Sequence, residues 1–198
     1  MKSTRTRPRA YRMSARADAA TDTHRRVLEA AIRQFGARLY DEVSLADVAR
    51  DAGVTVQTVL RRFGSKEALT EAAAALGMEE VRRSRWSAPV GNVTAALHGL
   101  IEHYEVWGDR SLRFLSQEQR IPAMRRVTDA GRALHHEWVD HVFAPWLAAA
   151  RGVARTRLRA RLIAGTDVYV WKIMRRDLGL GARATEVTMR ELAAALIT

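Results

Sequence analysis

The stretch Ser44–Lys66, SLADVARDAGVTVQTVLRRFGSK, contains the pattern of two short amphipathic helices joined by a tight turn. Ser44 can cap the first helix and Thr55 the second, because a hydroxyl accepts a hydrogen bond from the free backbone amides of a helix start. Gly53 lies between them and can adopt the left-handed conformation that ends a helix at least cost. The apolar positions recur at helical spacing. They are Leu45, Val48, Ala49 and Ala52 in the first helix, and Val56, Val59, Leu60 and Phe63 in the second.

The second of these helices has a polar side that suits contact with bases. At 100° per residue the apolar stripe leaves Gln57, Thr58 and Arg61 on the opposite side, with Arg62 at its flank. Two short helices around a glycine-centred turn form a helix-turn-helix, whose second helix can enter the major groove of DNA. Arginine and glutamine are suited to bidentate contacts with guanine and adenine. The pattern therefore predicts a helix that reads double-stranded DNA.

Composition and charge agree with a folded DNA-binding protein. The chain has 198 residues, 47% of them hydrophobic, no cysteine and a formal net charge of +11. Residues 1–66 hold 14 basic and 7 acidic side chains, against 19 and 15 in residues 67–198. This excess near the N-terminus favours a polyanionic partner. No secretory signal and no apolar run long enough to cross a bilayer is present, so we expect a cytoplasmic protein without a membrane partner.

The first 22 residues are basic and poor in apolar side chains, so we expect them to be disordered in isolation. They hold Lys2, Arg5, Arg7, Arg9, Arg12 and Arg16. Two interpretations stay open: a solubilising tail, or an arm that lies along phosphates or in the minor groove. We predict three parts of the chain, namely this arm (1–22), a helix-turn-helix domain (23–66) and a helical regulatory and dimerisation domain (67–198).

A first helix is predicted from about Thr23 to Arg38, with Val27, Leu28, Ala30, Ala31 and Phe35 on its buried side and Arg25, Arg26 and Arg33 in water. The run from this helix onward, VLEAAIRQFGARLYDEVSLADVARDAGVTVQTVLRRFGSKEAL, resembles the N-terminal domain of the tetracycline-repressor (TetR/AcrR) family of bacterial transcriptional regulators. The matching features are AA-x3-F in the first helix, SLADVARDAGV in the second, and FGSKEAL at the end of the third. The resemblance covers residues 23–69.

The resemblance implies a set of DNA contacts on the third helix and at two helix starts. Thr55, Val56, Gln57, Thr58 and Arg61 would face DNA, and Arg62 flanks them. Lys66 would bind a phosphate at the start of the fourth helix, and Ser44 one at the start of the second. The sequence departs from the family at Leu39, which replaces a glycine that ends the first helix. It departs again at Leu60, which replaces a phosphate-binding tyrosine but can touch a thymine methyl.

After this domain we expect further helices, and no strand, because no stretch alternates with period two. The predicted ranges are 65–85, 90–107, 111–119, 122–147, 153–178 and 183–197, which gives an all-α protein of about nine helices in total. The last two helices could form a four-helix dimer interface. Its candidate residues are Leu158, Leu162, Tyr169, Val170, Ile173, Met174, Leu192, Ala195 and Leu196.

The middle of the chain is rich in bulky side chains, which at helical spacing either form the core or line a cavity for a small, mostly apolar inducer. The candidate ligand-binding residues are His103, Trp107, Phe114, Met124, Trp138 and Tyr169. His103 and Trp107 are four residues apart and could face the same space. Asp167 could supply a charge to a ligand or pair with an arginine.

No catalytic motif is present, and we expect no enzyme, no cofactor and no metal site. His136 and Asp140 share one helix face, but no second group of ligands accompanies them. The sequence thus predicts a homodimeric repressor that leaves a palindromic operator when it binds an inducer. Two alternatives stay open: a constitutive or architectural DNA-binding dimer without a ligand, and a helical protein–protein adaptor that has lost DNA binding.

Overall fold

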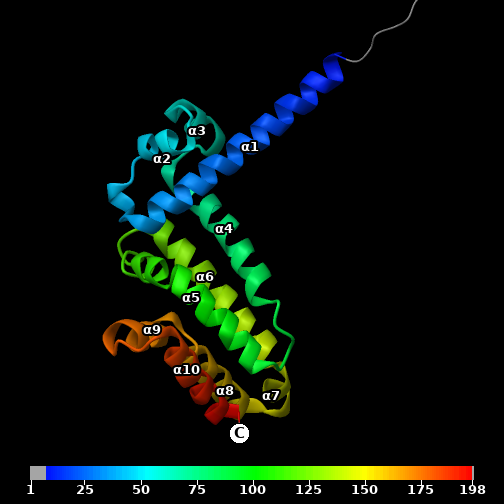
Figure 1. The fold of residues 1–198 in the computed structure, drawn as a ribbon, viewed down its shortest axis with the longest axis vertical. Coiled ribbons are helices and arrows are strands. Elements are labelled where there is room, and N and C mark those ends of the chain that lie inside the picture. Colours follow the sequence, from blue (N-terminus) through cyan, green and yellow to red (C-terminus); the bar gives the residue numbers. More distant parts are fainter. Residues whose placement is uncertain (1–7, 198) are drawn as a thin grey trace, which may run out of the picture. The chain divides into compact units, whose positions relative to one another are not determined.

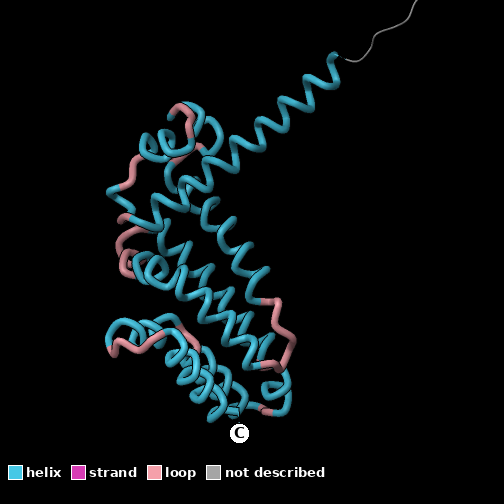
Figure 2. Tube along the Cα trace, viewed as in Figure 1, coloured by secondary structure: helices cyan, strands magenta, loops and turns pink. Residues whose placement is uncertain are grey.

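The computed structural model describes the backbone of residues 8–197 and the side chains of residues 19–197. Over this range the chain is all-α, as predicted, with helices joined by short loops (Figure 2). The helices labelled in Figure 1 are α1 (Pro8–Ala37), α2 (Leu45–Ala52), α3 (Val56–Phe63), α4 (Lys66–Arg85), α5 (Val93–Leu115), α6 (Pro122–Val142), α7 (Ala144–Ala149), α8 (Gly152–Gly165), α9 (Val168–Lys172) and α10 (Ala182–Ile197). A 3-10 turn, η1 (Tyr40–Glu42), and a π-helical turn, η2 (Ile173–Asp177), complete the described elements.

The chain divides into two compact units between Ala74 and Ala75, inside α4. We call them the N-terminal unit and the C-terminal unit and describe each by itself. The division lies eight residues beyond the boundary at 66 that the sequence suggested, because the first turns of α4 belong to the core of the N-terminal unit through Leu69 and Ala73.

Helix α1 begins at Pro8, which corrects the expectation of a disordered arm over residues 1–22 and a helix start near Thr23. Proline fits the first turn of a helix because its backbone angle is already helical and its missing N–H is not needed there. The alanines, arginines and methionine that follow are strong helix formers, and they outweigh the low apolar content that suggested disorder. Residues 1–7, with Lys2, Arg5 and Arg7, lie outside the described residues.

The core of the N-terminal unit confirms the predicted buried side of the first helix, since Val27, Leu28, Ala30, Ala31 and Phe35 are all buried. The buried side of α3 is narrower than predicted. Of its apolar residues only Val59 is buried, whereas Val56 and Leu60 are each 37% exposed. Phe63 is half-buried and stacks on His24 of α1, with 5.0 Å between ring centroids.

In the C-terminal unit, α5 runs without interruption where the sequence suggested two helices, over 90–107 and 111–119. Gly108, which lies between these two ranges, is helical, and the ring of Trp171 packs against α5 at this position. A Cβ atom at position 108 would come within 2.4 Å of the Trp171 ring. The glycine therefore serves a close approach and does not end the helix.

The predicted helix over 153–178 is in fact three elements, because Asp167 begins a new helix. Its carboxylate accepts a hydrogen bond from the backbone N–H of Tyr169 at 2.9 Å, which caps α9. Asp167 is thus a helix cap, and no ion pair joins it to an arginine among the described residues; its role toward a ligand stays a prediction. The predicted helix over 122–147 likewise divides into α6 and α7, at Phe143.

The π-helical turn η2 is tied to α5 by two pairs of charged side chains. Arg175 reaches both carboxylate oxygens of Glu105 at 2.7 Å, and Arg176 reaches those of Asp109 at 3.0 and 2.8 Å. Two adjacent arginines therefore contact two carboxylates four residues apart on one helix. These pairs fix η2 against α5.

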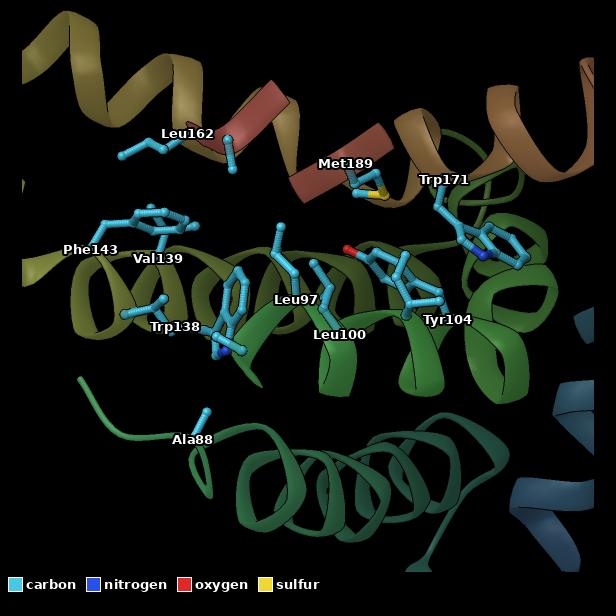
Figure 3. Close-up of a cluster of buried hydrophobic side chains, with 14 of the residues drawn as sticks. Ala88, Leu97, Leu100, Tyr104, Trp138, Val139, Phe143, Leu162, Trp171 and Met189 are labelled. Atoms are coloured by element: carbon cyan, nitrogen blue, oxygen red, sulfur yellow. The ribbon is translucent and has the colours of Figure 1, made fainter. Parts of the chain in front are cut away.

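Aromatic and aliphatic side chains of α5, α6 and α8–α10 form the core of the C-terminal unit (Figure 3). Trp138 and Phe143 are fully buried and meet edge to face, with centroids 6.3 Å apart. Among the residues expected at a dimer interface, Leu162 and Met174 are buried in this core. By contrast, Tyr169, Ile173 and Leu192 are 52%, 49% and 43% exposed. Only the exposed ones are free to meet another chain.

Candidate nucleic-acid interface

The turn between α2 and α3 has the geometry that its sequence predicted. Gly53 ends α2 with φ 65° and ψ 40°, in the left-handed region. Thr55 caps α3, because its hydroxyl oxygen accepts a hydrogen bond from the N–H of Thr58 at 3.2 Å. Gly64, with φ 79°, ends α3. The short helix α3 is thus defined at both ends.

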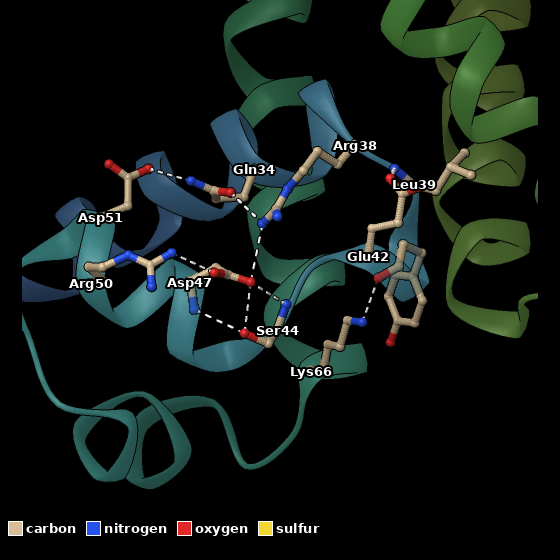
Figure 4. Close-up of polar contacts among 10 residues, drawn as sticks. Gln34, Arg38, Leu39, Glu42, Ser44, Asp47, Arg50, Asp51 and Lys66 are labelled. Carbon is tan, nitrogen blue, oxygen red and sulfur yellow. Dashed lines mark hydrogen bonds and ion pairs between the residues drawn. The ribbon is translucent and has the colours of Figure 1, made fainter.

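Helix α1 holds α2 through side chains that the sequence analysis placed in water. Arg26 donates a hydrogen bond to the carbonyl oxygen of Ala52 at 3.0 Å, at the last residue of α2. Arg33 pairs with both carboxylate oxygens of Asp51 at 3.1 and 3.2 Å. Gln34 also donates to Asp51, as Figure 4 shows. These contacts fix the end of α2 that leads into the turn. Sequence periodicity marks these residues as exposed, which they are, but it cannot show their partners.

Ser44 caps α2 as predicted, but it offers no free donor to a phosphate. Its backbone N–H and its hydroxyl both donate to Asp47, at 3.0 and 2.7 Å, and its hydroxyl oxygen accepts from the N–H of Asp47 (Figure 4). These hydrogen bonds, with Arg50 and Arg38 close by, hold the pKa of Asp47 well below its usual range. The start of α2 therefore carries its own carboxylate, and the phosphate contact expected at Ser44 stays a prediction.

The outward side of α3 carries most of the side chains that the sequence assigned to DNA. Thr55, Val56, Gln57, Leu60 and Arg61 are exposed. Within the described residues, no hydrogen bond or ion pair engages the side chain of Gln57 or Arg61. Two side chains that can each form a bidentate hydrogen bond are thus exposed and available on one short, capped helix.

Two further predicted contacts on α3 are less accessible. Thr58 is half-buried, and its hydroxyl lies 3.0 Å from that of Thr55. Arg62 is also half-buried, and its Nε atom is buried without a partner among the described residues. Arg62 therefore lies at the edge of the exposed face, in agreement with its flanking position in the sequence.

Lys66, expected to bind a phosphate, folds back onto the turn that precedes α2. Its ammonium group lies 4.0 Å from the centre of the Tyr40 ring and donates to the Tyr40 carbonyl oxygen (Figure 4). The Tyr40 hydroxyl in turn donates to Glu67 at 3.1 Å. Partial burial lowers the pKa of Lys66. Lys66 thus links α4 to η1, a role that the sequence did not indicate.

The first helix ends without a left-handed residue, as expected from Leu39. This residue has φ −66° and ψ 151°, and its N–H donates to the Glu42 carboxylate at 3.0 Å. The 3-10 turn η1 then leads the chain to α2. Extended backbone at Leu39 replaces the glycine of the family pattern.

The six candidate ligand-binding residues occupy different environments in the C-terminal unit. Trp138 and Met124 are buried in packed core, whereas Tyr169 is 52% exposed on α9. His103 is half-buried beside Tyr104, and Trp107 is covered by Arg110. Phe114, near the end of α5, is also half-buried. They do not share one environment, and their role as a set stays a prediction.

The described part of the chain holds no group of three histidine, cysteine or acidic side chains placed to bind a metal ion. Asp140, considered with His136 as a ligand pair, is bound instead by Arg159 at 2.7 and 2.8 Å. None of the helices within residues 8–197 has the length and apolar character that crossing a bilayer requires.

Residues 27–73 match the family of bacterial regulatory proteins described as the tetR family. The match covers about a quarter of the chain, and it identifies this segment as the domain of a tetR-family regulator. The matched segment comprises the end of α1, α2, α3 and the start of α4, so the N-terminal unit is the family's DNA-binding domain. The family consists of transcriptional regulators and not of enzymes, in line with the sequence analysis.

A curated relative also matches part of this chain. The HTH-type transcriptional regulatory protein RaaS of Mycobacterium tuberculosis is 42% identical over 69 residues, which cover 35% of this chain and 32% of that protein. The match thus spans about a third of the relative's length. It supports the assignment of a helix-turn-helix regulator.

Solved structures extend the similarity to most of the chain, as fold alone. Salmonella enterica GusR is similar with a TM-score of 0.68 at 19% identity, over 88% of this chain and 95% of that one. A proposed transcriptional regulator from Pseudomonas aeruginosa PAO1 is similar with a TM-score of 0.62 at 19% identity, over 87% and 89%. The predicted architecture, a helix-turn-helix domain followed by a helical domain, is confirmed.

Proposed function

We propose that this TetR-family protein is a homodimeric, ligand-responsive repressor that binds an operator with dyad symmetry. The observation that carries the proposal is the exposed face of α3, where Gln57 and Arg61 have no partner among the described residues. Both ends of α3 are fixed, by the Thr55 cap and by Gly64. A rigid short helix with free bidentate donors suits insertion into a major groove.

The net charge supports a polyanionic partner for this face. Of the arginines of the N-terminal unit, Arg33 and Arg38 pair with carboxylates, whereas Arg61 does not. Counterion release from phosphates would add affinity that falls with salt. Val56 and Leu60, each 37% exposed on the same helix, would supply apolar contacts such as those to thymine methyl groups.

Dimerisation would let two copies of α3 read two half-sites one helical turn apart. Tyr169, Ile173 and Leu192 are large apolar side chains left exposed on the elements α9, η2 and α10. Exposed apolar side chains on these elements support a contact with a second chain. In a repressor of this kind, an inducer would act through its different affinity for the DNA-bound and free states.

The experiment that tests DNA reading is a binding titration on the DNA upstream of the protein's own gene, against a scrambled fragment of equal length. Arg61→Ala should lower specific affinity by about 1–3 kcal/mol if Arg61 reads a base. Lys66→Met keeps the apolar stem on Tyr40 but removes the charge. If the Lys66 ammonium group turns from the Tyr40 carbonyl oxygen to a phosphate when DNA binds, this variant should weaken binding to both fragments alike and flatten the salt dependence.

The matched control is Arg157→Ala, which removes an exposed arginine from α8 in the C-terminal unit. We expect it to leave the affinity for both fragments unchanged. Equal losses from Arg61→Ala and Arg157→Ala would show that only overall charge matters. No binding to any genomic fragment at moderate salt would overturn the proposal and favour the adaptor alternative.

A further inference from the structure

Arg85, the last residue of α4, is a buried cation in the C-terminal unit. Only 5% of its surface is exposed. Its guanidinium lies over the Trp138 ring, 4.5 Å from the centroid, and its Nη2 atom is 3.0 Å from Nδ1 of His135. Its Nε atom is buried and has no partner among the described residues. Arg85 therefore has one hydrogen-bond partner and one aromatic face, but retains unused donor capacity.

No carboxylate lies within ion-pair distance of Arg85 in residues 19–197. Other arginines of the same unit do have such partners, since Arg82 pairs with Glu137 and Arg159 with Asp140. Those arginines are much more exposed, with 48% and 35% of their side-chain surface open. These two more exposed arginines thus have a counter-charge, whereas the buried Arg85 has none among the described residues.

The groups around Arg85 are neutral at pH 7. Burial, with the charge of Arg85 as a smaller cause, lowers the pKa of His103 to about 3 and that of His135 to about 3. Burial raises the pKa of Tyr104 further above its ordinary value, so this residue keeps its proton. Arg85 itself stays charged, although burial lowers its pKa to about 10.

The hydrogen bonds fix the tautomer of His135. Its Nδ1 atom faces a guanidinium, which can only donate, so Nδ1 accepts and the proton resides on Nε2. Nε2 lies 3.2 Å from the Thr166 hydroxyl and 3.3 Å from the Ile163 carbonyl oxygen, both of which can accept. His135 is thus a neutral imidazole. The positive charge of Arg85 therefore has no negative charge beside it within this cluster.

A second buried donor without a partner adjoins this cation. Trp138 is fully buried, and its indole Nε1 has no acceptor among the described residues. Figure 3 shows this nitrogen on the side of the ring toward Ala88, three residues after Arg85. Buried polar groups normally have partners, and a buried charge that lacks one is costly. A cation–π contact and one hydrogen bond to a neutral ring offset only part of that cost.

We propose that the cluster of Arg85, His103, Tyr104, His135 and Trp138 binds an organic carboxylate, and that the inducer is therefore an anion with an apolar body. The carboxylate would accept from the free Nε–H of Arg85, and the aromatic rings would contact the apolar part of the ligand. Guanidinium–carboxylate hydrogen bonds are among the strongest in proteins, especially away from water. The role of this anion as an inducer rests on the proposed function, whereas the binding site itself does not.

The test measures thermal stability of the full chain, without DNA, in the presence of aromatic and aliphatic carboxylates. The probes are benzoate, phenylacetate and octanoate, each compared with its neutral amide at the same millimolar concentration. We expect at least one carboxylate to raise the midpoint by about 5 °C and its amide to have no effect. This comparison needs no variant. If no carboxylate exceeds its amide, or if sulfate acts as strongly as the best carboxylate, the proposal is overturned.

The variant Arg85→Met keeps a long side chain over Trp138 and removes the charge. We expect it to abolish the carboxylate-dependent shift without lowering the midpoint of the ligand-free protein, since removal of an unpaired buried charge is often stabilising. The matched control is Arg83→Met, two residues earlier, where 75% of the side chain is exposed. It should keep the full shift. A shift that survives Arg85→Met would assign the anion to another site and overturn the proposal.

The same carboxylate is then added to the complex of the protein with its upstream DNA. A carboxylate that binds through Arg85 but leaves DNA affinity unchanged would sustain the anion site and contradict the ligand-responsive repressor. Release of DNA by a neutral amide, but by no carboxylate, would sustain the ligand-responsive repressor and contradict the anion site. The two proposals can therefore fail separately.

Discussion

Two arginines, one in each unit of the molecule, present their charge in opposite ways: Arg61 at the surface and Arg85 in the core. In the N-terminal unit, arginines lie at the surface, where Arg33 and Arg38 pair with carboxylates and Arg61 is free. In the C-terminal unit, Arg85 is buried beside aromatic rings and has no carboxylate partner within the part of the chain that the structure describes. A surface charge suits a large polyanion that meets it in water, and its effect is screened by salt. A buried charge acts strongly on a small anion, because the surroundings screen it less.

The largest expected effect concerns the core on which the buried cation rests. Phe143→Ala removes a fully buried ring that meets Trp138 edge to face. We expect a loss of about 3–5 kcal/mol in the free energy of unfolding of the C-terminal unit. All five tryptophans lie in this unit, so tryptophan fluorescence in urea reports it selectively. The control Val153→Ala, at a residue 66% exposed, should change stability by less than about 0.5 kcal/mol.

The second-largest expected effect is that acid lowers the stability of the C-terminal unit more than that of the N-terminal unit. Burial lowers the pKa of His103 and of His135 to about 3, whereas in the unfolded chain both would bind protons near pH 6.5. The unfolded state therefore holds more protons than the folded state between these values, and stability falls as the pH falls through that window. The loss is on the order of 2 kcal/mol for each histidine at pH 5 relative to pH 7.

The N-terminal unit should resist this change, because its paired carboxylates titrate lower. Hydrogen bonds hold the pKa of Asp47 and of Asp51 below the usual range, so their contribution persists until the pH falls below about 4. Urea titrations at pH 7, 6 and 5, followed by tryptophan fluorescence and by far-ultraviolet circular dichroism, measure both units. His103→Gln and His135→Gln should flatten the fluorescence response. A response to acid that is unchanged in both variants would contradict the assignment.

A smaller effect is expected at the start of α3. Thr55→Ala removes the hydroxyl that accepts from the Thr58 N–H, and a lost cap of this kind costs about 1 kcal/mol. Far-ultraviolet circular dichroism in urea should register this loss while tryptophan fluorescence stays unchanged. Thr55→Ser retains the acceptor and should behave as the natural chain. Equal stability of the alanine and serine variants would show that α3 does not depend on its cap.

The smallest expected effect concerns Leu39, where the family pattern has glycine. Since Leu39 has φ −66°, glycine would relieve no strain and would only add freedom to the unfolded chain. We therefore expect Leu39→Gly to destabilise the N-terminal unit, by about 0.5–1 kcal/mol. A gain in stability, measured by circular dichroism in urea, would show that this turn prefers the left-handed conformation.

The sequence predicted those parts of the fold that depend on local pattern. The caps at Ser44 and Thr55, the left-handed turn at Gly53 and the buried side of α1 all follow from residue type and spacing, and the structure confirms them. The start of α1 at Pro8 was missed because a high content of charge outweighed good helix propensity in the prediction. Local sequence rules alone do not show whether charge content or helix propensity has the larger effect.

The remaining differences arise from contacts between residues far apart in the chain. Gly108 indicates a helix end until Trp171, sixty-three positions later, fills the space beside it. Arg85 ends a run of charged residues and suggests a solvated face, yet it is buried by His135 and Trp138. Lys66 likewise binds Tyr40, twenty-six residues before it. No periodicity within a single helix contains this information.

The π-helical turn η2 has a consequence for how the length of this region can change. A π turn holds one residue more than the α-helical turn it replaces, and here it lets the neighbours Arg175 and Arg176 both contact α5. A chain one residue shorter could close this turn as ordinary helix, but it would then direct only one of the two arginines to α5. Insertion or deletion here is therefore coupled to charge, so a shorter chain that keeps this packing should lack one of the carboxylates at positions 105 and 109.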